Sequence, residues 1–515
     1  MWQAGSDREA TMATIDLGIA HRTNDTPPPP DIPLSDIDLG SLDFWGGWDD
    51  DRRDGAFATL RREAPVAFFF ESATAPGFEA GPGHWALTSY DHVHHASRHP
   101  DLFSSTPTSV SLSEIDPAVA EFSGSMINLD DPRHQRLRSI VNRAFTPKKM
   151  VARIDESVRK RARQLVTDMV VSHPDGTADF VEYLSGPFPL QIICDMMGIP
   201  EADQQKVFHW TSVALGIGDE EVASDHDEVI QVVLDLAAYG VELAESRRAE
   251  PADDLTSNLV SAEVDGEQLS SAEIASFFML LSAAGNETTR NAISHGMVAL
   301  SRYPDARATW WADFDGVATT AVEEIVRWAS PVIFMRRNLT EDIELGGVRM
   351  RAGDKVSMWY NSANRDEAKF DNPWLFDVTR NPQPALRIRR WRSALLPGRQ
   401  PGPARDPRAV RGIASPNPPR YRRRRGTGHP VVGVPPRHQA TTCALDTAGL
   451  TAYEDCSRAF VETLSPPPPS RGRRFEGNTS TKDFGLPTFT AVSFGLLLVI
   501  GAWGGVMRGG RQPTG

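Results

Sequence analysis

The hydrophobic pattern of the chain centres on one long apolar stretch, from Ser271 to Leu300. Ser270 followed by Glu273 has the spacing of a capping box, which predicts that a helix begins there. The residues that follow are nearly uncharged, with large apolar side chains at Ile274 and at 277–281. We therefore expect this helix to be buried around most of its girth, with other elements packed against it.

Polar residues interrupt this apolar pattern in the middle of the predicted helix, in the run Ala284-Gly285-Asn286-Glu287-Thr288-Thr289. A glycine costs about 1 kcal/mol in a helix interior. The Thr288 hydroxyl can compete for the carbonyl of Ala284 and loosen the helix locally. A buried carboxylate such as Glu287 is costly unless it is hydrogen-bonded or used. Taken alone, the run fits a helix N-cap or a hydrated kink as well as a catalytic site.

The remaining pattern predicts a mainly α-helical protein with a small β-sheet. Residues up to Pro33 are polar and include four consecutive prolines, so we expect 1–33 to be a disordered lead-in and the globular part to begin at Leu34. Further helices are predicted at 52–63, 90–99, 133–141, 151–171, 189–197, 227–250 and 320–328. Strands are predicted at 65–70, 84–88, 333–339 and 355–360.

Composition narrows the classes of function. A formal charge of −14 over 515 residues argues against general nucleic-acid binding. Three cysteines, and no early charged segment followed by an apolar one, indicate a reducing cytoplasm without a secretion signal. Cys194 lies in an apolar run and is interpreted as a small buried core residue.

Two pairs of charged residues have helical spacing. His134 and Arg138 stand four apart on a basic helix that follows Pro132, so they share a face and suit an anionic group; a solvated basic face is the alternative. Glu324 and Arg327 stand three apart among apolar residues. Because such a pair contributes little on a surface, we predict that it is buried and structural.

Together these motifs resemble, in order, those of the cytochrome P450 family of haem-thiolate monooxygenases, over roughly Leu34 to Pro384. The resemblance implies the cytochrome P450 fold and a catalytic domain over 34–384, with haem b as cofactor. It implies that Glu287 and Thr288 form the acid–alcohol pair that relays protons during oxygen activation. The implied cofactor-binding residues are His134, Arg138 and Arg337 at the haem propionates and Ala284 and Gly285 on the central helix; the implied structural cluster is Glu324, Arg327 and Arg380.

The resemblance also implies an activity and its partners. Residues 77–89, 124–147 and 179–200 are most similar to actinobacterial enzymes that hydroxylate sterol side chains and methyl-branched lipids. The expected reaction is oxygen insertion into an apolar substrate. Electrons would come from a ferredoxin and its NAD(P)H-dependent reductase, because no flavin or iron–sulfur domain is visible in the sequence.

One family feature is missing: the glycine-rich loop that carries the cysteine ligand of the iron. After Pro384 the composition changes to arginine and proline, and no lysine occurs between Lys369 and Lys482. If Ala385–Gly398 is back-translated and the first base dropped, compatible codons read His-Phe-Ala-Phe-Gly-Gly-Gly-Gly-Ala-His-Tyr-Cys-Leu-Gly, which is such a loop. Degenerate codons leave freedom, but Trp391 has only one codon. The hypothesis is one extra base near the Pro384–Ala385 junction.

This hypothesis makes 385–485 an aberrant Arg/Pro-rich tail and disrupts the haem-loop section of the fold. Cys443 and Cys456 lie in the tail without a glycine loop, so no iron ligand is predicted and the chain as written is expected to be inactive. The alternative is a haem-free remnant that binds lipid. The arginine run at 420–425 is not taken as a nucleic-acid site. Residues 486–507 are apolar enough for a membrane anchor, although an accidental apolar run is the favoured interpretation.

Overall fold

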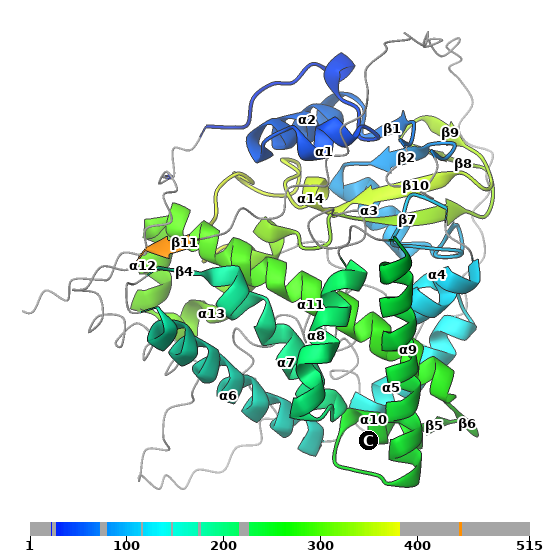
Figure 1. The fold of residues 1–515 in the computed structure, drawn as a ribbon. Coiled ribbons are helices and arrows are strands. Elements are labelled where there is room, and N and C mark those ends of the chain that lie inside the picture. Colours follow the sequence, from blue (N-terminus) through cyan, green and yellow to red (C-terminus); the bar gives the residue numbers. More distant parts are fainter. Residues whose placement is uncertain are drawn as a thin grey trace, which may run out of the picture.

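The computed structural model describes residues 22, 27–72, 80–114, 117–145, 148–173, 177–215, 226–381 and 442–444. It is mainly helical, with the sheet and the first helices on one side and the longer helices on the other (Figure 1). The α-helices are α1 Leu42–Gly46, α2 Asp50–Glu63, α3 Tyr90–Arg98, α4 Pro117–Gly124, α5 Arg133–Phe145, α6 Lys148–Ser172, α7 Pro187–Met197, α8 Glu201–Leu215, α9 His226–Ala249, α10 Leu255–Ser261, α11 Ser271–Arg302, α12 Pro304–Ala312, α13 Phe314–Ala329 and α14 Tyr360–Ala363.

Helix α11 runs through the middle of the helical part (Figure 1). The predicted capping box forms, because the Ser270 side chain accepts from Glu273 N while the Glu273 carboxylate accepts from Ser270 N at 2.8 Å. The apolar first half of α11 is buried in the largest core cluster, together with residues of α5, α7 and α9. Close packing requires a glycine in α9: a Cβ at Gly240 would lie 3.0 Å from the Cα of Ala275. The expectation of a helix buried on most sides is confirmed.

The sheet has five strands in the order β1-β2-β10-β7-β3. Strand β10 pairs parallel to β2, and the other neighbours pair antiparallel. All four predicted strands are present in it. The strands are β1 Val66–Phe69, β2 His84–Leu87, β3 Phe103–Ser104, β7 Phe334–Leu339 and β10 Lys355–Trp359; three small hairpins or pairs use β4 Thr177–Asp179, β5 Glu263–Val264, β6 Glu267–Gln268, β8 Ile343–Leu345, β9 Val348–Met350 and β11 Thr442–Ala444.

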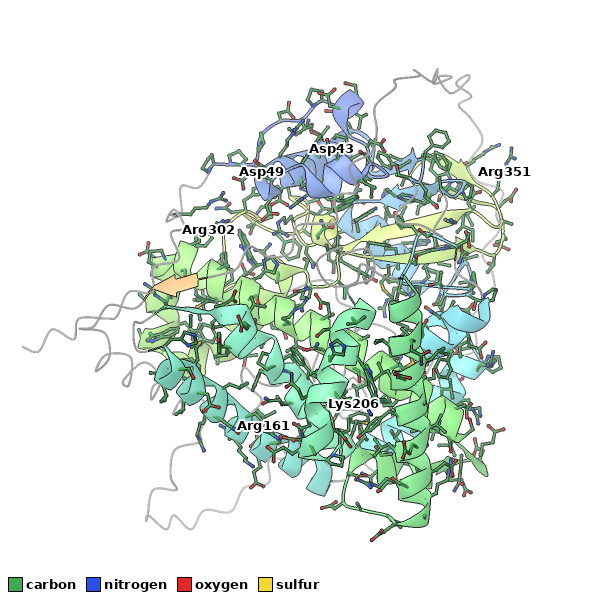
Figure 2. All side chains as sticks on the ribbon, viewed as in Figure 1. Asp43, Asp49, Arg161, Lys206, Arg302 and Arg351 are labelled. Carbon is green, nitrogen blue, oxygen red and sulfur yellow. The ribbon has the colours of Figure 1, made fainter. Side chains whose placement is uncertain are left out.

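Two ion pairs fasten outlying segments to the core. Arg22 N donates to the carbonyl of Arg302 at the end of α11 (2.7 Å), and the Arg22 guanidinium pairs with Asp51 of α2 at 2.7 Å. Figure 2 labels Arg302 there, near the start of α2. On the helical side, Arg161 of α6, also labelled, pairs with Asp195 of α7 at 2.7 Å. Of the expected disordered lead-in, the structure describes only residue 22 and residues 27–33.

Helix α13 shows where the sequence-based bounds were too short. It was predicted at 320–328 but begins at Phe314, because the Asp313 side chain accepts from Gly316 N at 3.1 Å and caps it. It ends at Ala329, one residue beyond the predicted end, and Ser330 follows in a left-handed conformation with φ 38°. No helix among the described residues is long and apolar enough to cross a membrane. The candidate anchor 486–507 lies outside the described residues.

Candidate active site

The acid and the alcohol of the central motif point to different partners. Thr288 Oγ1 donates to the carbonyl of Ala284 at 2.6 Å, so the predicted competition for this carbonyl is present. The Glu287 carboxylate accepts from Arg290 Nη2 at 2.6 Å and from Asn291 Nδ2 at 3.0 Å. These donors lie three and four residues further along the same helix face. Glu287 and Thr288 are therefore neighbours in the sequence, but their side chains have separate hydrogen-bond partners.

Helix α5 separates its cations into an exposed and a buried set. The outer arginines have partners on neighbouring elements: exposed Arg133 pairs with Glu121 of α4 at 2.5 Å, and half-buried Arg136 with Glu273 of α11 at 2.7 Å. His134 and Arg138 are buried, with 7% and 8% of their surface exposed. Both therefore face the interior, as the spacing of four residues predicts, and the solvated-face alternative does not hold for them.

The ring of His134 is oriented by the chain that precedes α5. His134 Nδ1 lies 2.8 Å from the carbonyl oxygen of Met126. A carbonyl only accepts, so Nδ1 carries the hydrogen, and Nε2 can donate only when the ring is cationic. Burial lowers the pKa of His134, an effect that Asp130 and Asp131 partly oppose.

Arg337 brings a third buried cation from the sheet. It lies on β7, is 4% exposed, and donates from Nη1 to the carbonyl of Arg336 at 2.7 Å. Burial lowers the pKa of Arg337, and it lowers the pKa of Arg138 as well. Asp130 acts electrostatically on both Arg337 and His134, so the start of α5 and the middle of β7 share one acidic neighbour.

The chemistry of this donor set fits the acidic edge of a haem. Burial disfavours the charged forms of His134, Arg138 and Arg337. Binding a dianion would offset this cost, because charge-assisted hydrogen bonds are the strong ones. Gly285 of α11 is buried and Ala284 is half-buried, so the two helix positions that the resemblance assigns to the haem both lie in the interior rather than in solvent.

Glu324, Arg327 and Arg380 form a closed cluster. Arg327 Nε and Nη2 contact the two Glu324 oxygens at 2.7 and 2.8 Å, and both side chains are fully buried. Arg327 also donates to the carbonyls of Asn364 and Pro373, each at 2.9 Å. Arg380 Nε lies 3.3 Å from Glu324 Oε2 and supplies the third member. The predicted pair is therefore buried, and the residue chosen from the sequence to complete it does contact Glu324.

The Cys194 side chain lies in the core and not among these residues. Cys194 is fully buried in the core cluster on α7, and burial raises the pKa of its thiol to about 12, which agrees with the predicted core role. Cys443 lies on β11, opposite Ala178 of β4. Cys456 lies outside the described residues.

Sequence reasoning missed two residues near the site. Asp130 accepts from Ser105 N at 2.8 Å, and its own carbonyl accepts from His134 N at 2.9 Å. Its position at the start of α5 was a usable signal. Arg336, which precedes Arg337, was the other residue that was missed. Neighbouring strand residues point to opposite faces, so two consecutive arginines must lie in different surroundings.

Comparison with known proteins now identifies the class. Residues 83–384 match the sequence model of the Cytochrome P450 family, and the chain belongs to this family. It is 65% identical over 372 residues to a methyl-branched lipid omega-hydroxylase of Mycobacterium tuberculosis, covering 72% of this chain and 86% of that protein. It is 39% identical over 336 residues to a steroid C26-monooxygenase of Mycobacterium bovis, covering 64% of this chain and 75% of that protein.

Solved structures agree on the fold. A cytochrome P450 of Mycobacterium marinum in complex with pseudoionone is 38% identical with a TM-score of 0.62, covering 69% of this chain and 85% of that one. One from Novosphingobium aromaticivorans is 29% identical with a TM-score of 0.57, covering 68% of this chain and 85% of that one. The predicted family and its mainly helical fold with a small sheet are confirmed.

Proposed function

We propose that the intact site hydroxylates the terminal carbon of a long, methyl-branched apolar lipid. The buried cations His134, Arg138 and Arg337, together with the acid–alcohol motif of α11, carry this proposal. The lipid omega-hydroxylase at 65% identity supports the substrate class, and the steroid C26-monooxygenase supports a second, related one. We place the protein in the cytoplasm.

The side chains of the site would divide the work. A bound haem b would supply the oxygen-activating chemistry. His134, Arg138 and Arg337 would hold its propionates, and their burial would keep water from that edge. The Thr288 hydroxyl, held on the Ala284 carbonyl, and the Glu287 carboxylate, held by Arg290, would move protons at a dry site by a fixed route. A ferredoxin and its NAD(P)H-dependent reductase would deliver the electrons.

The substrate proposal is tested on the protein with its reading frame restored after Pro384. Added methyl-branched fatty acid should shift the haem absorption spectrum, and turnover with ferredoxin, reductase and NADPH should give the terminal alcohol. A straight-chain fatty acid of equal length is the matched control and should react more slowly. A product hydroxylated only on a sterol would replace the lipid proposal by the steroid one; neither product would overturn both.

We also propose that the chain as written cannot complete this site, because one extra base displaces the cysteine loop. Two observations support this: the family match ends at residue 384, and Cys194 is fully buried in the core of α7. Sequencing the gene across the codons for 381–398 tests it. If no frame of the true codons encodes the cysteine loop, the account of the tail is wrong.

A second candidate follows from the same observation. Without a thiolate, the chain would be a haem-free remnant that at most binds lipid through its large apolar core. Purified chain that is colourless and binds a fluorescent fatty acid would support the remnant. Purified chain that carries haem with a thiolate-type spectrum would exclude it.

A further inference from the structure

Two histidines lie next to each other at the last turn of α3. The helix packs Val93 and Ala96 into the core beneath the sheet (Figure 1). His95 lies in the last turn of α3, and His99 is the residue that caps its end. Residues four apart are neighbours on one helix face. The two ring centres are 4.1 Å apart and the ring planes are inclined by 30°. Two imidazoles are therefore adjacent at this end of the helix.

A hydrogen bond of the His99 ring settles its tautomer. His99 Nδ1 lies 2.8 Å from the carbonyl oxygen of His95. Because a carbonyl only accepts, Nδ1 carries the hydrogen, and Nε2 of the neutral ring keeps its lone pair. Histidines that bind metal ions almost always donate their other ring N–H to a carbonyl, a carboxylate or water, which orients the ring and makes the binding nitrogen more basic. His99 therefore already has the tautomer and the support that a metal ligand needs.

The surroundings of His95 favour its neutral ring. Partial burial lowers the pKa of His95, the neighbouring His99 and His92 lower it further, and Asp101 opposes them. The edge of Phe103 meets the His95 ring, with ring centres 6.0 Å apart and planes at 86°. Both histidines nevertheless remain partly exposed. At neutral pH an ion from solvent would therefore meet an imidazole that does not have to lose a proton first.

A second histidine in this structure shows what sets His99 apart. His173, directly after α6, has the same kind of hydrogen bond, from Nδ1 to the carbonyl oxygen of Met169 at 2.9 Å. Its neighbouring ring is that of Tyr183, with centres 4.3 Å apart, and not a second imidazole. His99 thus combines an oriented ring with a second imidazole. It also has the carbonyl end of a helix and the charge of Asp101 close by, and both favour a cation.

We propose that His95 and His99 form a two-histidine site for a divalent transition-metal ion that prefers imidazole, namely Cu²⁺, Ni²⁺ or Zn²⁺. An ion about 2.0–2.1 Å from each nitrogen needs the two nitrogens about 3.3 Å apart, which small side-chain rotations supply. No group of three or more histidines, cysteines and acids in the described part of the chain could hold a metal ion, so water completes the coordination. The ion joins the last turn of α3 to its cap and stabilises the folded chain by mass action.

The site is tested by calorimetric titration of Ni²⁺ alone into the full chain, made without a polyhistidine tag, near neutral pH. The wild-type chain should bind one equivalent that His95→Gln and His99→Gln each weaken by at least about tenfold, the least that losing even an outer-shell partner of a metal site costs. The double variant should be no weaker than either single one, because one imidazole cannot chelate. Ni²⁺ should also raise the melting temperature of the wild-type chain and not that of the variants, whose fold is checked by circular dichroism.

His173→Gln is the matched control, because it removes a carbonyl-bonded histidine at a helix end that has no second imidazole beside it. It should leave the Ni²⁺ isotherm and the rise in melting temperature unchanged. A wild-type isotherm equal to that of the double variant would overturn the site and leave a stacked pair of rings. An equal loss in His173→Gln would overturn it too, because single histidines would then account for the binding. The assay needs neither haem nor turnover, so its result is independent of the proposed function.

Discussion

Two groups of buried cations in this protein are stabilised in different ways. Arg327 is fully buried but closed by its own chain, with two contacts to Glu324 and further bonds to backbone carbonyls. His134, Arg138 and Arg337 are also buried, but desolvation lowers the pKa of all three. The charges of the first group are therefore neutralised and hydrogen-bonded by groups of the protein itself. The second has the charge and burial that the proposed haem-propionate site requires.

Removing the guanidinium of Arg327 should have the largest effect. Arg327→Leu leaves the Glu324 carboxylate buried beside a hydrocarbon, which costs about 3–5 kcal/mol of unfolding free energy. Urea denaturation followed by circular dichroism measures this cost. Arg349→Leu, in an exposed pair with Glu344, is the control and should change stability by less than about 1 kcal/mol. Equal small losses in both variants would show that the buried Glu324–Arg327 pair contributes no more to stability than an exposed pair.

Acid should destabilise the protein through buried histidines outside the closed cluster. The folded-state pKa of His84 is about 4, below its ordinary value of 6.5, so the unfolded chain binds the proton first. Stability is therefore lost as the pH falls from about 6.5 to about 4, by about 3 kcal/mol for this residue. Thermal unfolding at several pH values checks this, and His84→Phe should flatten the slope. An unchanged slope in that variant would contradict the neutral, buried ring.

Arg380 tests whether the two arginines beside Glu324 contribute unequally to stability. It contacts Glu324 at 3.3 Å and donates to the carbonyl of Asp371 at 2.7 Å, but Arg327 still neutralises Glu324 when Arg380 is absent. Arg380→Leu should therefore cost about 2 kcal/mol, less than Arg327→Leu. The same urea experiment compares the two. A loss as large as that of Arg327→Leu would show that Glu324 needs both arginines.

Replacing Arg138 should lower the affinity for haem and have little effect on stability. Arg138→Leu removes a desolvated cation, so the unfolding free energy of the haem-free chain should change by less than about 1 kcal/mol. The affinity for added hemin, followed by its absorbance, should fall about tenfold with the loss of a charge-assisted bond. Arg133→Leu on the same helix, whose side chain pairs with Glu121 at the surface, should leave both quantities unchanged. A strongly destabilised Arg138→Leu would mean that Arg138 is structural.

The side-chain contacts of this protein that could be predicted from the residues alone are those decided within one helix. The capping box at Ser270, the Thr288 hydroxyl bond and the Glu324–Arg327 pair all join residues three or four apart. The bond between Arg290 and Glu287 has the same spacing, but the sequence analysis did not predict it. The resemblance assigned Glu287 to a pair with Thr288 instead.

The buried pair of Lys355 and Glu71 depends on pairing that is not local. Lys355 and Glu71 are 284 positions apart in the chain, and they meet only because β10 lies between β2 and β7. The sheet register that puts Lys355 and Arg336 on one face cannot be read from either strand alone. Likewise, the position of Asp130 at the start of α5 could be read from the sequence, but its contact with Ser105 could not, because that contact joins distant segments of the chain.

The absorption spectrum of the reduced protein under carbon monoxide tests the central claim most directly. It is recorded on the chain as written and on the chain encoded after one base is removed at the Pro384–Ala385 junction. The account predicts a thiolate-type Soret band only in the second protein, with residues 1–384 identical in both. A thiolate-type band in the chain as written, or its absence from both, would contradict the claim that this chain keeps the propionate side of a cytochrome P450 site and has lost the axial ligand.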